Sequence, residues 1–241
     1  MKMGNKDKIT IENFEDFMGF VKYKGDWECA IYRGQKDDYE LKPSVSRNEF
    51  IKGRDVVDVE KEIFSYFKER AVLNTEYLPN NEWEWLALAQ HFGLPTRLLD
   101  WTRNPLVAAY FAVEDDEWGK NSFIYILTEG SYYVYDENNK GASNPFECDS
   151  VKIYSPKHIT NRITAQQSVF TLTPTPLSSI DSYEDDYKEL RTYMIVSDFR
   201  KELKDILNLF GINRASLFPD LAGLTDHIRW LSQNNGKKLL V

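Results

Sequence analysis

The sequence contains few of the residues from which metal-bound or disulfide-linked frameworks are built. Among 241 residues there are two cysteines, Cys29 and Cys148, and three histidines. Two cysteines cannot supply a disulfide framework or a zinc quartet, and no histidine has a second ligand at helical metal spacing. We therefore expect no metal site, and we expect Cys29, which lies in an apolar stretch, to be a small core residue.

Long apolar runs and two common catalytic motifs are also missing. No run of about 18 apolar residues predicts a transmembrane helix, and the N-terminal residues lack the apolar region of a signal peptide. We therefore expect a cytoplasmic protein with no membrane partner. Neither the P-loop pattern nor G-x-S-x-G occurs, so P-loop and serine-hydrolase chemistry have no support.

Positive charge is in short supply. Lys and Arg number 30 against 38 Asp and Glu, which gives a formal net charge of −8. Such a chain does not attract nucleic acid through its overall electrostatic field, so a nucleic-acid-processing enzyme is our least favoured hypothesis. The net charge does not exclude a local basic groove. The simpler interpretation of the excess negative charge is solubility.

Aromatic residues, by contrast, are plentiful at 14% of the chain. This is more than a core of this size usually needs, and we interpret some of the rings as walls of a binding pocket. The length favours one large domain over residues 1–241, with a helical lead-in over 1–26, a core over 27–231 and a tail over 232–241. Helical and strand patterns mix without regular βαβ alternation, which predicts an α+β fold.

Hydrophobic periodicity and capping residues predict the individual elements. Helices are expected from Thr10 as a cap, over 60–73 and 82–92, after Asn104 and Pro105, from Ser197 to Phe210, and over 219–231. Strands are expected over 27–32, 122–128, 132–135, 151–154, 168–172 and 192–196. Residues 173–189, with two prolines and an acidic patch, are expected to form an exposed excursion.

Three segments carry polar residues within otherwise well-patterned elements. The first is Tyr32-Arg33-Gly34-Gln35 at a strand end, where Arg33 can present its planar fork to an anion while Gly34 lets the backbone approach closely. The alternative is a surface arginine beside a turn glycine. The third is 161–170, where Arg162 and Gln166 precede a strand, and an ordinary strand entry is the alternative.

The second segment is the densest. It is expected to be a loop between two helices, and such loops commonly hold sites. Its polar or aromatic members are Gln90, His91, Thr96, Arg97, Asp100, Trp101 and Thr102. The structural alternative is that Arg97 pairs with Asp100 while His91 caps the preceding helix.

With these residues in view, the chain resembles the FRG domain family, named for a Phe-Arg-Gly tripeptide. Here the tripeptide is Tyr32-Arg33-Gly34, and the more specific similarity is the block QHFGLPTRLLDWT at 90–102, continued by 104–112. Arg162-Ile163 with Gln166, and the block LFPDL at 217–221, resemble later parts of the family pattern.

The order of elements in that family is in turn similar to ADP-ribosyltransferases of the Arg–Ser–Glu type. This resemblance implies a mixed or antiparallel sheet with helices packed around it, and NAD as substrate or ligand. Arg33 matches the first position, which holds the phosphates or ribose, and Trp101-Thr102 with the following apolar helix resembles the second. The third position, a glutamate, is absent, because this chain offers only Gln166 there.

The resemblance therefore implies an NAD-binding transferase-like domain that cleaves the nicotinamide glycosidic bond in a toxin or phage-defence setting, with a protein as one expected acceptor or partner. In this hypothesis His91 and Asp100 provide acid–base or electrostatic catalysis and Gln166 contacts the ribose. The remaining candidates bind the nucleotide: Arg33, Gly34, Gln35, Gln90, Thr96, Arg97, Trp101 and Thr102. The alternative is a non-enzymatic nucleotide sensor or protein-interaction module on the same scaffold.

Overall fold

The structure is a computed structural model that describes residues 8–23, 30–75, 78–115, 119–128, 144–157, 160–184 and 189–234. Cys29, the start of the strand predicted over 27–32, and the strand predicted over 132–135 lie outside these ranges. In the described part of the chain, no helix is long and apolar enough to cross a membrane.

The described strands form one mixed sheet of seven strands in the order β1-β7-β4-β2-β3-β6-β5. Their bounds are β1 Ile9–Ile11, β2 Ala30–Gln35, β3 Leu98–Thr102, β4 Ser122–Thr128, β5 Lys152–Tyr154, β6 Ser168–Leu172 and β7 Glu189–Ile195. The β1–β7 pair is parallel, and the other pairs are antiparallel. The predicted α+β class and mixed sheet are confirmed.

The α-helices of the described residues are α1 Phe14–Val21, α2 Asn48–Ile51, α3 Val56–Ala71, α4 Glu82–His91, α5 Pro105–Val113, α6 Asn161–Ala165, α7 Ser197–Leu209, α8 Arg214–Leu217 and α9 Leu221–Asn234. The α5 prediction is confirmed in detail, since Pro105 occupies the first turn and the Asn104 side chain accepts a hydrogen bond from the Leu106 amide.

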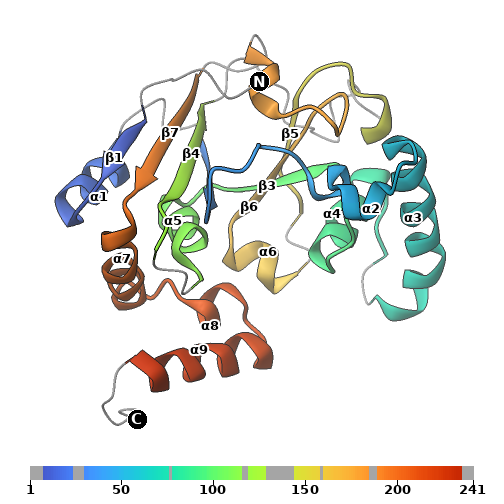
Figure 1. The fold of residues 1–241 in the computed structure, drawn as a ribbon. Helices are drawn as coiled ribbons and strands as arrows, with labels where there is room; N and C mark the ends of the chain where they lie inside the picture. The colour runs from blue at the N-terminus through green and yellow to red at the C-terminus, as the bar shows by residue number, and fades with distance from the viewer. Residues whose placement is uncertain are drawn as a thin grey trace.

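The helices gather on one face of the sheet, as Figure 1 shows. One apolar cluster joins α1, α5 and α7 to β1, β7, β4 and β2, and a second joins α3 and α4 to β3, β6 and β5. A third cluster, built on Leu99, Trp101, Phe123 and Tyr125, covers the opposite face. Successive strand residues point to opposite faces, so Asp100 lies on the helical face while Trp101 lies on the other.

Three local predictions are wrong. The cap of α1 is Asn13, whose side chain accepts from the Asp16 amide, because Thr10 belongs to β1. Residues 98–102 form β3 instead of a loop, since both faces of this strand are buried and no simple alternation appears. The predicted excursion at 173–189 is not merely exposed, because Ile180 is completely buried in the third cluster. In the third segment Arg162 and Gln166 precede a strand, β6, as predicted, and α6 adds a helical turn before it.

Candidate functional site

The sheet opens between β2 and β3, next to Arg33. Strand β2 pairs with β4 along all six of its residues, whereas the only described pairing between β2 and β3 is Tyr32 opposite Thr102. Beyond that pair the two strands diverge. We call the place where their pairing ends, between Arg33 and Asp100, the β2–β3 opening.

Arg33 spans this opening with its guanidinium. Its Nη1 donates a hydrogen bond to the Asp100 carbonyl oxygen at 2.7 Å. Its Nε is buried and has no hydrogen-bond partner in the described structure. Burial lowers the pKa of Arg33, and the nearby Asp100 charge opposes that shift. The YRGQ segment and the central segment therefore meet, although Arg33 starts from the sheet face opposite to the Asp100 side chain.

Asp100 presents its carboxylate from the helical face and is exposed. The Gln90 amide, near the end of α4, donates to Asp100 Oδ2 at 2.9 Å. The Thr96 hydroxyl in turn donates to Gln90 Oε1 at 2.8 Å and accepts from the Leu98 amide at 3.1 Å. This chain of hydrogen bonds fixes the carboxamide of Gln90 and, through it, the carboxylate of Asp100. Thr96 is completely covered and thus acts as a support for Gln90 and not as a ligand contact.

His91 is the last residue of α4 and lies half-buried beside α6. Its Nδ1 is 3.5 Å from the hydroxyl of Thr160, the residue that caps α6. Burial lowers the pKa of His91, the nearby Arg162 lowers it further, and Asp220 opposes both. The imidazole is therefore neutral at physiological pH. A neutral imidazole can accept a proton or a hydrogen bond.

Gln166 ends α6 and lies beside the end of β3. Its side-chain amide donates to the Leu217 carbonyl at 3.1 Å, and its backbone carbonyl accepts the Thr102 hydroxyl at 2.7 Å. The structure thus brings the α6–β6 segment against β3, as the predicted site requires, and it leaves Oε1 and one N–H group of the Gln166 carboxamide without a described contact. No carboxylate occupies this position.

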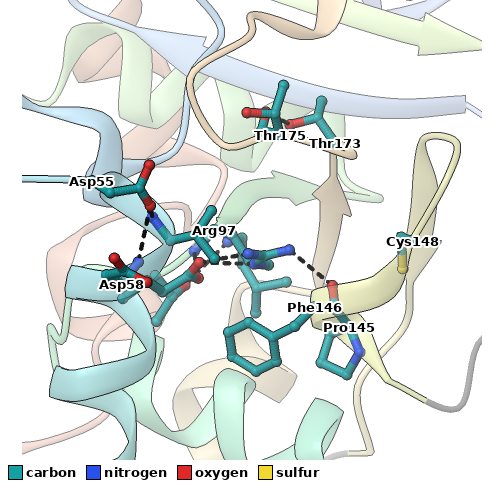
Figure 2. Close-up of polar contacts among 12 residues, drawn as sticks. Asp55, Asp58, Arg97, Pro145, Phe146, Cys148, Thr173 and Thr175 are labelled. Atoms are coloured by element: carbon teal, nitrogen blue, oxygen red, sulfur yellow. Dashed lines mark hydrogen bonds and ion pairs between the residues drawn. The ribbon is translucent and has the colours of Figure 1, made fainter.

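Arg97, predicted to bind the nucleotide, instead forms a buried clamp. Its backbone amide, Nε and Nη2 reach the two carboxylate oxygens of Glu60 on α3 at 2.8, 2.9 and 2.8 Å. Its Nη1 donates to the Pro145 carbonyl at 3.0 Å, and Figure 2 shows the guanidinium near the Phe146 ring, 4.6 Å from its centroid. The side chains of Arg97 and Glu60 are each 1% exposed. The predicted alternative pair of Arg97 with Asp100 is also wrong.

Two further candidates serve packing. A Cβ built on Gly34 would lie 1.9 Å from the Ala108 carbonyl oxygen and 2.6 Å from the Ala112 nitrogen, so Gly34 lets α5 pack closely on β2. Trp101 is buried in the third cluster, and its indole donates to the Thr171 hydroxyl at 2.8 Å. Both residues therefore have packing roles in the fold.

Gln35 and Thr102 are buried as well. The Gln35 amide donates weakly to the Tyr39 carbonyl at 3.4 Å and helps to hold the segment that follows β2. The Thr102 hydroxyl donates to Gln166 and accepts from the Asn104 amide at 3.0 Å. Both of its hydrogen-bonding roles are therefore used within the protein.

Arg162 is the important residue that the candidate set omits. It lies on α6 with its guanidinium 4.4 Å from the Phe218 ring centroid, and that guanidinium has no hydrogen bond or ion pair to any described residue. Arg162 and Gln166 are four residues apart, so a helix places them on one face. That spacing is the signal in the sequence that points to Arg162 as a companion of Gln166.

A separate cavity of about 380 Å³ lies among α5, α7 and α9. Its lining includes Lys204, Arg214 and Trp230, and it contains none of the predicted site residues. Its charges are largely matched internally, since Arg214 pairs with Glu114 at 2.6 Å and with Asp226 at 3.5 Å. We therefore place the candidate site at the β2–β3 opening, where the buried Nε of Arg33 has no described partner. Across the described residues, no cluster of His, Cys, Asp and Glu side chains is able to hold a metal ion.

The segment that builds most of this site has a recognisable family pattern. Residues 28–121 match the FRG domain. The matched stretch runs from β2 to the end of α5 and the turn before β4, so it contains Arg33, Gln90 and Asp100, and it supports the FRG family. Arg162 and Gln166 lie beyond it. No curated protein and no solved structure matches the chain.

Proposed function

We propose that this FRG protein binds NAD at the β2–β3 opening and cleaves its nicotinamide glycosidic bond in the manner of an ADP-ribosyltransferase. The sheet order supports this proposal, because β2, β3 and β6 are neighbours. Arg33 lies on β2 and Thr102 on β3, and Gln166 comes just before β6. These are the three positions that the resemblance implies. The side-chain contacts around Asp100 then suggest how the chemistry is divided.

In this proposal Asp100 takes the electrostatic role of the missing glutamate. It is the exposed carboxylate at the opening, and Gln90 holds it in place. When the C–N bond breaks, its electron pair neutralises the pyridinium nitrogen of the leaving nicotinamide, and positive charge develops on the ribose. A fixed carboxylate stabilises that charge. With water as acceptor, the ribose carbon gains a hydroxyl and one proton is released, for which we assign neutral His91 as the base.

The remaining ligand-binding roles are assigned to hydrogen-bonding groups that the fold leaves without a partner. Arg33 retains a buried Nε without a partner, which suits a phosphate or ribose oxygen. Gln166 contributes its amide oxygen to a ribose hydroxyl. The clamp of Arg97 with Glu60 and the Thr96–Gln90 hydrogen bond act indirectly, by positioning Asp100.

The test is release of free nicotinamide from NAD, followed by NMR with the pure protein. Asp100→Asn is expected to lower the release rate by roughly 10²–10³, the cost of removing a preorganised electrostatic contact. Arg33→Ala is expected to weaken NAD binding. Asp205→Asn is the matched control, because Asp205 is an exposed carboxylate on α7, away from the opening. Equal release by the Asp100 and Asp205 variants contradicts the role of Asp100.

The second candidate is a non-enzymatic nucleotide sensor or protein-interaction module. The observation that favours it is Gln166, an uncharged residue whose amide nitrogen is already bonded to Leu217. This alternative predicts saturable NAD binding without nicotinamide release. Absence of any NAD binding contradicts the enzyme and the nucleotide sensor and leaves the protein-interaction module. A toxin or defence role follows only from the company that FRG domains usually keep, and it stays a proposal.

A further inference from the structure

Helix α9 is attached to the rest of the protein by one of its faces. A Cβ built on Gly223 would lie 2.0 Å from the Phe218 carbonyl oxygen, so the first turn of the helix packs closely against the end of α8. Further along, the Trp230 ring centroid lies 5.5 Å from Lys204 Nζ on α7, beside the cavity among α5, α7 and α9. These contacts fix which side of α9 faces inward.

Four apolar side chains lie together on a different face of α9. Leu221, Leu224 and Ile228 are 80%, 44% and 43% exposed, and Leu231 is partly exposed. At 100° per residue these four positions fall within an arc of about 80°, and we call them the α9 stripe. Figure 1 shows α9 at the lower edge of the molecule, with α8 between it and the sheet. Apolar groups that gather on an exposed face are typical of an interaction surface.

The spacing of the α9 stripe is the same in both directions along the helix. Its intervals are three, four and three residues, which is also the spacing of the two apolar positions in a coiled-coil heptad. Against a second α9 that runs antiparallel, Leu221 meets Leu231 of the other copy and Leu224 meets its Ile228. The antiparallel direction also brings the positive end of one helix dipole to the negative end of the other. The stripe is therefore complementary to itself about a twofold axis, as a symmetric dimer requires.

We propose that the protein forms a weak symmetric dimer through antiparallel pairing of α9 with the α9 of a second copy. This inference does not depend on the proposed function, because no residue of the α9 stripe belongs to the candidate site. The helix itself carries one acidic and one basic side chain, Asp226 and Arg229, so pairing two copies of it brings no net charge together.

The size of the stripe and the charge of the whole chain limit the affinity. The exposed parts of Leu221, Leu224 and Ile228 are equivalent to less than two fully exposed residues. That is well below the roughly 800 Å² that each partner buries in a stable complex, so we expect a dissociation constant on the order of 0.1 mM. Because each copy has a net charge of −8, added salt should strengthen the dimer by screening the repulsion.

Sedimentation equilibrium of the full chain, from about 1 µM to 1 mM, tests the dimer. Leu224→Glu places a carboxylate at the centre of the pairing in both copies, and it is expected to raise the dissociation constant by roughly 10-fold or more. Leu73→Glu is the matched control, because Leu73 is a 94% exposed leucine in the turn Val72–Asn74 after α3, and it should leave the constant unchanged. A wild-type chain that stays monomeric throughout, or equal effects of the two substitutions, overturns the proposal.

A mixture of two variant chains tests the antiparallel direction. Leu221→Glu and Leu231→Lys should each weaken the dimer of their own chain. In the mixed dimer, the new carboxylate faces the new ammonium at one contact, and the native leucines still meet at the other. The mixture should therefore associate roughly 10-fold more tightly than either variant alone. No gain on mixing overturns the antiparallel pairing, and this result decides the proposal if circular dichroism shows that Leu224→Glu does not fold.

Discussion

Removal of the Glu60 charge should destabilise this protein severely, although Glu60 touches no candidate ligand site. Its carboxylate accepts three N–H groups of Arg97, and both side chains are 1% exposed. In Glu60→Gln an amide NH2 group replaces one carboxylate oxygen, so it faces Arg97 N–H donors that need an acceptor. The Arg97 guanidinium then remains buried without a carboxylate partner. Among the described residues, the Pro145 carbonyl and the Phe146 ring still contact it.

The magnitude follows from that desolvation. Breaking a buried pair by removing one partner costs about 3–5 kcal/mol, because the other charge cannot return to water. For a chain of this length, each kcal/mol corresponds to about 2–4 °C, so the melting temperature should fall by roughly 6–20 °C. Replacing both residues in Glu60→Leu with Arg97→Met should recover part of the loss, since neither charge is then left alone.

Urea denaturation of each variant provides the measurement, and α3 itself provides the control. Glu62 on the same helix pairs with Arg54, but these side chains are 63% and 54% exposed. Glu62→Gln should therefore cost less than about 1 kcal/mol. A loss below about 1 kcal/mol for Glu60→Gln, or equal losses for both variants, would refute the clamp.

Three further outcomes are expected. Gly34→Ala should lower the free energy of unfolding by about 1–3 kcal/mol or more through its clash with the α5 backbone, whereas Gly19→Ala on α1 has open space and should raise it by about 0.5–1 kcal/mol in the same melts. The pKa of His91 is lowered on folding, so below about pH 6.5 the unfolded chain binds a proton at this histidine more readily than the folded protein does, and the free energy of unfolding falls. Stability measured from pH 7 to 5 should therefore decline less steeply in His91→Gln, and an unchanged slope contradicts this. Trp101→Phe should cost about 1–3 kcal/mol of stability by losing its indole hydrogen bond and volume, while the NAD affinity stays the same. Weaker NAD binding at unchanged stability would instead show that the Trp101 ring contacts the ligand.

Local signals in the sequence predict the elements whose stability is decided locally. The Asn104-Pro105 start of α5 and the apolar strands at 122–128 and 168–172 are correct to the residue, because capping and hydrophobic patterning act over neighbouring positions. The strand at 98–102 is not predicted, since its partners are β2 and β6, which are far away in the chain.

The same distinction explains which site residues the sequence predicts. Gln90 and Asp100 are correctly placed together, because ten residues of a helix, a turn and a strand return the chain to the same edge. The sequence offers Asp100 as the neighbour of Arg97, but the carboxylate that binds Arg97 is 37 residues earlier, on another helix. Likewise, the requirement for glycine at 34 comes from α5, whose backbone would meet a Cβ there.

Arg97, Arg33 and Arg162 differ in how far the protein itself supplies partners for the guanidinium. Arg97 is surrounded by acceptors and anchors the start of β3, and this anchor holds the Thr96–Gln90–Asp100 hydrogen bonds in register. Arg33 donates to the Asp100 carbonyl but keeps a buried Nε without a described partner, and the Arg162 guanidinium, over the Phe218 ring, bonds to no described residue. Proteins tolerate such uncompensated charge where a ligand supplies the missing partner, and they lose some stability by keeping it. The guanidiniums without a carboxylate partner, more than the Tyr32-Arg33-Gly34 tripeptide itself, are therefore our reason for placing the candidate site at the β2–β3 opening.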